Sequence, residues 1–386
     1  MRGTRLAVGL VLAIASIAFA QTRPATNAVA TLNPPGIADA TLVTLKLSAA
    51  DADSAIAELS KQSGYELKPY NDVGWKQATL GAVTLSLDKQ PFWAAFLQMG
   101  TQAGFALMQN DAALNGRRLT LYPFNQGGQD ASKYPTFISG AFLIHATGIQ
   151  RTSTVEFAKA KAINRNVNMQ IQVYSEPKVH VLKMSYTPEI MEAMDNRGNS
   201  LIVPGQSNSS SGNMQIGGGI TWGVGIALQY PSQNPGDKIA ILRGRFRTVV
   251  QTHSETMEIP DILTAKEQTK TIGGRRVVFK SFKKQNDRQY QAEVTIYRDE
   301  MEQEEFNRLS DSFAIRLMDS SGNAFWSNGG GSSSTGKEAS RQVLFYKRTR
   351  EEGGTNLGEP FKLALDIPTA SREVMIPFEF ANLPLP

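Results

Sequence analysis

The sequence predicts a mainly β protein, in which an α+β module near the N-terminus is followed by two all-β antiparallel sandwich domains. Residues 43–67 and 83–107 are two ungapped copies of one 25-residue pattern, each with helical periodicity between two short alternating segments. After about Tyr134 helical periodicity nearly vanishes. Apolar and polar residues then alternate, most clearly over residues 361–367 and 374–380, which is typical of half-buried strands.

The chain begins with a pattern typical of a secretory signal peptide. Arg2 and Arg5 precede an apolar stretch, residues 6–17, and Ala18 and Ala20 are the small residues that a signal peptidase recognises. This stretch is shorter than the roughly 20 residues that cross a bilayer. We therefore predict cleavage after Ala20 and a periplasmic or secreted protein. The sequence contains no cysteine, which excludes disulfides and a lipidated N-terminus.

Composition limits the partners that the chain can take. Loss of the two leader arginines lowers the formal charge from +5 to +3, which is too weak to argue for nucleic-acid binding. No segment after the leader is apolar and long enough for a transmembrane helix. Residues 21–41 are rich in Pro, Thr, Ala and Asn and predict a flexible linker.

Each copy of the repeated pattern predicts a strand, a helix closed by glycine and a second strand. A final hairpin at Asn115 and Gly116 gives the order β-α-β-β-α-β-β over residues 42–124. A unit this short cannot bury its own apolar face, so the copies should pack together. The identical pairs are Val43/Val83, Thr44/Thr84, Leu45/Leu85, Leu47/Leu87, Ala55/Ala95, Gln62/Gln102, Gly64/Gly104 and Leu67/Leu107.

The module resembles the short N-terminal domain of secretins and TonB-dependent receptors. The segment VTLKLSAADADSAIAELSKQSGYEL and its copy VTLSLDKQPFWAAFLQMGTQAGFAL carry the resemblance, which covers residues 42–124 only. It implies a periplasmic module that contacts other proteins, and it implies no catalytic or cofactor-binding residue. The wider layout resembles uncharacterised exported bacterial proteins that join such a module to β-sandwiches.

We place the two sandwiches at residues 134–260 and 270–386. A second duplication supports this division, because Met-Asp-x-x-Gly-Asn occurs at residues 194–199 and again at 318–323. Asp195 and Asp319 could offer oxygens to calcium, but each motif supplies a single carboxylate. A turn in which the glycine takes positive φ explains the same residues, and we favour it.

Other candidate chemistry is better explained by structure. Residues 331–337 match a phosphate-binding loop, but Glu338 replaces its Ser or Thr in an all-β region, so we expect a hairpin loop. The acidic run at residues 299–305 predicts a solvated turn or short helix anchored by Met301 and Phe306. The three histidines have no metal-site spacing. We predict no catalytic residue, metal or cofactor.

Aromatic and basic residues are the only candidate ligand contacts. The aromatic residues could stack on sugar rings, although a core position explains them equally well. The arginines share one face of a predicted strand and could meet an anionic glycan, although solvated or edge-guarding charges explain them as well. The aromatic candidates are Tyr70, Trp75, Trp222 and Trp326, and the basic ones are Arg243, Arg245 and Arg247.

These observations favour an exported, non-enzymatic interaction protein of the bacterial envelope. In this hypothesis the module docks a protein partner through an open sheet edge, while the sandwiches act as spacers or binding modules. The alternative is an envelope protein that binds or senses a carbohydrate. An exported hydrolase is a minor alternative, because no nucleophile with its base is visible.

Overall fold

The computed structural model describes residues 36–70, 72–107, 118–126, 130–157, 162–204, 213–215, 221–310, 313–327, 330–347 and 357–386. The predicted leader, residues 21–35 of the predicted linker and the predicted hairpin turn at Asn115 and Gly116 lie outside these ranges. The described chain is mainly β, with several antiparallel sheets, which confirms the predicted class. Within it, no helix has the length and apolarity that crossing a bilayer requires.

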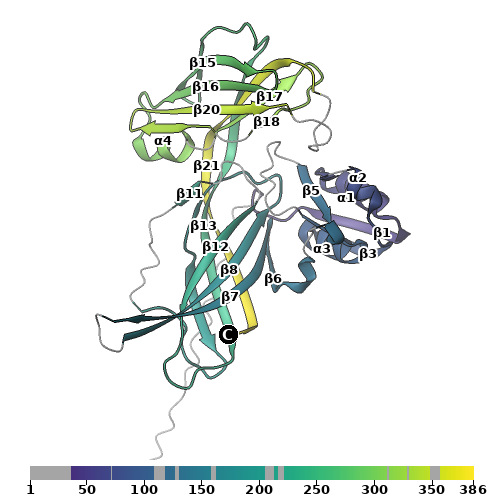
Figure 1. Cartoon of the computed structure of the whole chain (residues 1–386), viewed down its shortest axis with the longest axis vertical. Helices are drawn as coiled ribbons and strands as arrows, with labels where there is room; N and C mark the ends of the chain where they lie inside the picture. The colour runs from purple at the N-terminus through teal and green to yellow at the C-terminus, as the bar shows by residue number, and fades with distance from the viewer. Residues whose placement is uncertain are drawn as a thin grey trace, which may run out of the picture. The chain divides into compact units, whose positions relative to one another are not determined.

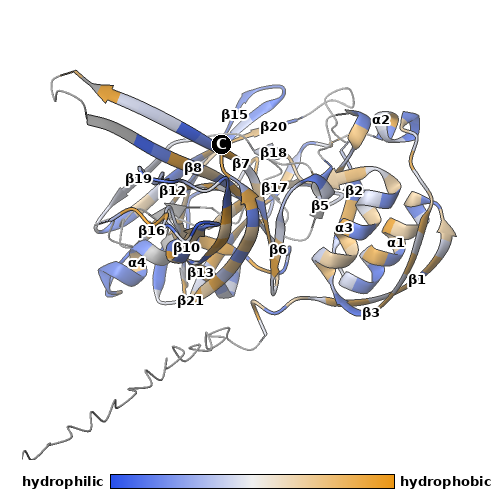
Figure 2. Ribbon diagram, turned by 90° about the horizontal axis from the view of Figure 1, so that it is seen from below, coloured by the Kyte–Doolittle hydropathy of each residue, from blue (hydrophilic) through white to orange (hydrophobic). Residues whose placement is uncertain are grey.

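Residues 42–123 form two small sheets around a pair of helices. Strands β1 and β3 pair antiparallel, and β2, β5 and β4 form a second sheet in which β2 and β5 are parallel. Figure 2 shows α1 and α3 next to each other beside β1 and β3. The elements are β1 (Leu42–Ala50), α1 (Ala52–Ser63), β2 (Glu66–Pro69), α2 (Asp72–Gln77), β3 (Val83–Pro91), α3 (Phe92–Ala103), β4 (Phe105–Leu107) and β5 (Arg118–Pro123).

The ends of the two long helices follow from their sequence. Asp51 caps α1, because its Oδ1 accepts a hydrogen bond from Ser54 N at 2.9 Å. Gly64 and Gly104 end α1 and α3 in the left-handed conformation, with φ of 73° and 89°, where a side chain would be strained. Helix α2, which has a single buried residue, Trp75, was not predicted.

Residues 36–41 are ordered, so the prediction of a flexible linker up to Thr41 is wrong for its last residues. Ala38 is buried, and its carbonyl accepts a hydrogen bond from Ala141 N at 2.8 Å. Gly140 has φ of 56°, and a Cβ there would lie 2.2 Å from the carbonyl oxygen of Ala38. Only glycine therefore allows this close approach of the two chain segments.

The remaining residues form three larger sheets. The first has the order β12 (Thr221–Gln229), β8 (Ala162–Ser175), β7 (Phe142–Glu156) and β6 (Thr136–Ser139). The second has the order β11 (Asn213–Gln215), β9 (Val181–Ser185), β13 (Lys238–Ile259), β21 (Pro360–Pro384) and β17 (Ala314–Asp319), with β10 (Glu189–Asp195) also on β13. The third has the order β14 (Gln268–Ile272), β15 (Arg275–Asn286), β16 (Gln289–Tyr297), β20 (Glu338–Tyr346) and β18 (Trp326–Ser327), with β19 (Ser332–Thr335) also on β20. Short helices are α4 (Gln303–Ser310), η1 (Phe124–Gln126) and η2 (Ala131–Lys133).

The β region has two halves, the first around the first sheet (β12, β8, β7 and β6) and the second around the third sheet (β14, β15, β16, β20 and β18). Two strands of the second sheet, β13 and β21, run through both halves. They pair antiparallel from Lys238 opposite Pro384 to Ile259 opposite Leu363, and Figure 1 shows them side by side. The second sheet therefore contributes to two cores. The first β core includes residues of β7, β8, β12 and the second sheet, and the second β core includes residues of β15, β16, β20 and the second sheet.

This shared sheet corrects the predicted division between residues 260 and 270. Val374, Ile376 and Phe378 belong to the first β core, although they were assigned to the second sandwich. Met257 and Ile259 belong to the second β core, although they were assigned to the first. Strands β13 and β21 each pass from one core to the other within the shared sheet, and alternation along a strand does not reveal which core each part faces.

Candidate functional site

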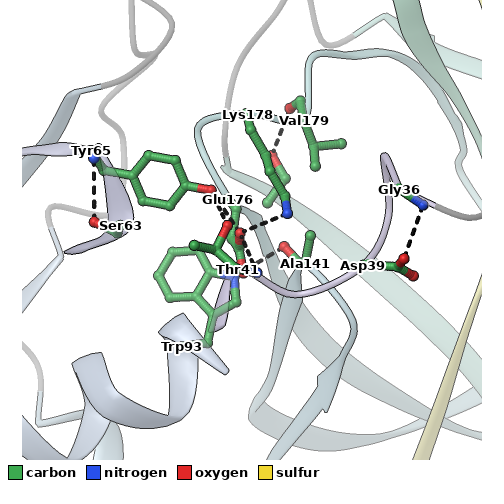
Figure 3. A network of polar contacts seen from close by, with 11 residues as sticks. Gly36, Asp39, Thr41, Ser63, Tyr65, Trp93, Ala141, Glu176, Lys178 and Val179 are labelled. Carbon is green, nitrogen blue, oxygen red and sulfur yellow. Dashed lines mark hydrogen bonds and ion pairs between the residues drawn. The ribbon is translucent and has the colours of Figure 1, made fainter. Parts of the chain in front are cut away.

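The N-terminal module is fixed to the first β half by a buried carboxylate. Glu176 follows β8 and has no solvent-exposed surface. Its carboxylate accepts hydrogen bonds from Thr41 N at 3.1 Å and from the Tyr65 hydroxyl at 2.7 Å (Figure 3). Lys178 Nζ lies 3.6 Å from Glu176 Oε2. A buried charge needs such partners, and here they come from three separate segments of the chain.

Further contacts extend this junction along α3. The indole nitrogen of Trp93 donates to Ala141 O at 3.0 Å, and the Trp93 side chain is fully buried. Leu143 and Tyr174, from β7 and β8, belong to the same hydrophobic cluster as the apolar residues of the module. The junction is therefore a packed interface with an ionic centre. Its contacts hold separate segments of the chain together.

A small cavity of about 30 Å³ lies in this junction, between α3 and β4 on one side and β7 and β8 on the other. Phe96, Gly100 and Phe105 line it from the module, and His145 and Tyr174 line it from the sheet. Because a water needs about 10–15 Å³, the cavity has room for about two or three waters.

His145 and Tyr174 are buried titratable groups that line this cavity. His145 Nδ1 lies 2.8 Å from the hydroxyl of Thr136, and burial lowers the pKa of His145 to about 4. The imidazole is therefore neutral at pH 7. Histidine spacing in the sequence gave no sign of this burial.

The repeated Met-Asp-x-x-Gly-Asn elements form two equivalent turns. Asp195 Oδ1 accepts from the backbone nitrogens of Arg197 and Asn199, and Asp319 Oδ1 accepts from those of Ser321 and Asn323. The glycines take φ of 82° and 83°, as the turn interpretation requires. Asp195 Oδ2 accepts a hydrogen bond from Gly236 N, and Asp319 Oδ2 accepts one from Gly358 N.

These hydrogen bonds lower the pKa of Asp195 to about 2, against the effect of burial, and lower the pKa of Asp319 in the same way. Both carboxylates are thus fully used by the protein's own donors. Among the described residues, no cluster of three or more acidic or histidine side chains could hold a metal ion. The turn explains the motif, and the calcium alternative has no support.

The four predicted aromatic contacts do not form a common platform. Trp75 is buried and donates to Asp53 at 2.8 Å, and Trp222 is buried in the first β core. Tyr70 is half-buried beside Tyr122, with ring centroids 4.9 Å apart. Trp326 is half-buried in the other half of the β region, with its ring centroid 5.5 Å from that of Tyr346. The core explanation therefore holds for Trp75 and Trp222.

The three predicted arginines do share one face of β13, as the alternation indicated. However, β13 lies inside its sheet, between β10 or β9 and β21, so these residues do not guard an edge. Acidic residues on the neighbouring strands neutralise them, which weakens their attraction for an anionic ligand. The ion pairs are Arg243 with Glu192 and Glu379, Arg245 with Glu189, and Arg247 with Glu373, at 2.9, 2.8, 2.6 and 3.5 Å.

The remaining sequence candidates have structural roles. Residues 332–335 form β19 and turn directly into β20, so the phosphate-loop match is a hairpin. The acidic run leads into α4, whose Phe306 is fully buried, as predicted. Arg275 is fully buried and donates to Pro368 O, and burial lowers its pKa to about 10.

In the two-stranded sheet of β1 and β3, residues that are identical in the two copies of the pattern make equivalent contacts. Gln62, in the last turn of α1, accepts a hydrogen bond from Thr44 N at 2.8 Å, and Gln102 of α3 accepts one from Thr84 N at 2.8 Å. Because the backbone nitrogens of Thr44 and Thr84 bond to helix side chains, they point away from the partner strand. The two copies therefore make the same contact in equivalent places.

The edge of β1 is the candidate docking surface. Since backbone direction alternates along a strand, Lys46, which is opposite Ser86, presents its N–H and C=O groups outward in the same way as Thr44. Strand β1 packs on α1 and β3 on α3. Helix α3 contacts the first β half through Trp93, and β1 begins at the junction, directly after Thr41.

Comparisons with known proteins add no family. No family model matches the chain, and no curated protein matches it. A solved structure described as the conserved domain protein from Bacillus anthracis is 11% identical, with 67% of this chain and 95% of that chain covered. Its TM-score of 0.20 is too low to support an argument about fold or function.

Proposed function

We propose that this chain is an exported, non-enzymatic interaction protein of the bacterial envelope that docks a protein partner through the edge of β1. The observation that supports this most is the two-stranded sheet of β1 and β3, in which neither strand has a second partner strand among the described residues. A strand edge of this kind can accept an extended segment through backbone hydrogen bonds.

The surroundings of this edge favour β1 over β3. Helix α1, next to β1, exposes Asp53, Lys61 and Gln62, whereas α3 is buried along most of its length. The junction around Glu176 holds the module on the first β half, so a partner bound at β1 would be carried by a rigid support. The resemblance to the secretin-type module and the leader sequence point to the periplasm as the place where this happens.

The carbohydrate alternative has less support. Two of its four aromatic contacts are buried, and its arginines are paired with glutamates. The hydrolase alternative also has less support, because the Thr136–His145 pair of the junction lies beside a cavity with room for only a few waters. We therefore propose the protein-docking function alone.

Paired proline substitutions test this function. Lys46→Pro removes an outward N–H from β1, and Ser86→Pro removes the equivalent one from β3, because the two residues are opposite each other in the ladder. The mature protein, immobilised as bait in envelope extract, should retain a partner that Lys46→Pro loses and Ser86→Pro keeps. Thermal melting of both variants checks that the module stays folded.

Two results would count against the proposal. Recovery of no envelope protein by the wild-type bait would remove the docking function. A partner that binds both proline variants equally would remove the β1 edge as the site and leave another surface responsible.

A further inference from the structure

The two halves of the β region contain equivalent strands, β12 and β20, whose outer edges are covered to different extents. Strand β20 follows the Asp319 turn and precedes β21, just as β12 follows the Asp195 turn and precedes β13. The outer edge of β20 is covered along its length. Strand β18 pairs with its end at Tyr346, β19 pairs with its start, and Gln342 N donates to Gly331 O at 2.8 Å between them.

The outer edge of β12 has no such cover in the described part of the chain, where β12 pairs with β8 alone. The short strand of the intervening segment, β11, pairs instead with β9 in the other sheet. Gln229 N donates to Leu201 O at 2.9 Å at the end of β12, and no described residue pairs with the outer edge from Thr221 to Ala227.

The direction of the free backbone groups follows from one hydrogen bond. Tyr230 N donates to Arg165 O, which extends the β12–β8 ladder by one residue. Because direction alternates, even-numbered residues of β12 bond to β8 and odd-numbered ones face the open edge. Gly223, Gly225 and Ala227 therefore present their N–H and C=O groups outward.

This edge lacks the features that protect edges from pairing. Residues 221–229 contain no charged residue and no proline, and they alternate strictly between buried and more exposed positions. Long, uncharged edge strands of this kind readily pair with another chain. A strand added here must continue the apolar inner face of the sheet and present small residues on its outer face.

We propose that β12 pairs with β12 of a second copy of this chain, antiparallel and centred on Gly225. The strand itself meets both requirements, because Trp222, Val224, Ile226 and Leu228 are buried on its inner side, while glycine and alanine are exposed on the other. Gly225 then faces Gly225, and Gly223 faces Ala227. No like charges oppose each other across this contact, so the first sheets of two copies join into one.

On the outer face of the proposed contact, side chains of β8 lie close to the glycines of β12. A Cβ at Gly225 would lie 3.1 Å from Asn168 Oδ1, and one at Gly223 would lie 3.4 Å from Gln172 Oε1. The amide side chains of β8 thus lie across the glycines, toward the open edge. In the dimer they are in place to cover the new strand pair with neutral polar groups.

Sedimentation velocity of the mature protein over a concentration series tests this proposal. We expect the wild type to sediment as a dimer that dissociates on dilution. Gly225→Asp places two carboxylates opposite each other at the centre, so it should sediment as a monomer with half the mass. Gln342→Asp is the control, because the same charge on the covered edge of β20 should leave the dimer intact.

A mixture provides the specific signature. Gly225→Asp and Gly225→Lys should each be monomeric, and together they should form a dimer, which only a contact centred on Gly225 explains. The proposal is overturned if the wild type is monomeric throughout, if Gly225→Asp remains dimeric, or if the mixture stays monomeric. None of these results depends on β1, so the dimer and the docking function can fail separately.

Discussion

The two copies of the 25-residue pattern share their internal contacts and differ in what surrounds them. Asp53, Glu58 and Lys61 of α1 correspond to Trp93, Gln98 and Thr101 of α3, so the second copy has no charge at these three positions. Helix α3 lies against the first β half, and its indole bonds to Ala141 there. Duplication thus kept the contacts that hold each copy and changed the face that meets another part of the molecule.

The largest expected loss of stability comes from a substitution at the position where the two copies of the pattern differ most. Trp93→Ala should lower the free energy of unfolding by about 3–5 kcal/mol, because it opens a cavity in the junction and leaves the Ala141 carbonyl without its donor. Asp53→Ala, at the equivalent position, should cost about 1–2 kcal/mol, because the buried Trp75 indole loses its acceptor. Urea unfolding of both variants measures the difference, and equal losses would show that the copies are equally buried.

A pH dependence should mark the junction beneath the second copy. Burial lowers the pKa of His145 from 6.5 to about 4, so between these values the unfolded chain binds more protons than the folded one. The stability from neutral His145 is complete above pH 6.5 and falls by about 3 kcal/mol as the pH drops to 4. His145→Gln should remove this part of the slope in urea unfolding, and an unchanged slope would contradict the prediction.

The smallest expected loss of stability should be the same in both copies of the pattern. Gln62→Ala and Gln102→Ala each remove one hydrogen bond to a strand nitrogen, so each should cost about 0.5–1.5 kcal/mol. Thermal unfolding of the two variants gives the comparison. A clear difference would mean that the edges of β1 and β3 are held differently, and it would weaken the use of Ser86→Pro as a matched control.

Local features of this fold could be predicted from the sequence because the residues that cause them are close together. The helix between Asp51 and Gly64 follows from its cap, its apolar spacing and its closing glycine. The turn at Asp195 follows from an aspartate and a glycine three residues apart. The helix near Phe306 follows from one apolar anchor in an acidic segment.

Features that depend on strand register could not be predicted. The alternation around Arg243 and Arg245 gave the correct face, but their glutamate partners lie on β10 and β21, far away in sequence. The passage of β13 and β21 from one core to the other could not be predicted either, because it depends on pairing between residues more than 100 apart in the sequence. Glu176 lies in a short polar connection, and nothing near it in the sequence indicates burial.

The buried carboxylate of Glu176 has a practical consequence for dissecting this protein. Its partners are Thr41, directly before β1, Tyr65, directly before β2, and Lys178, which forms an ion pair with it. A fragment ending between the module and β6 would lack the acceptor, and one starting at β6 would carry an ionised group stripped of two of its three partners. Truncations designed to map binding should therefore keep residues 36–185 in one piece.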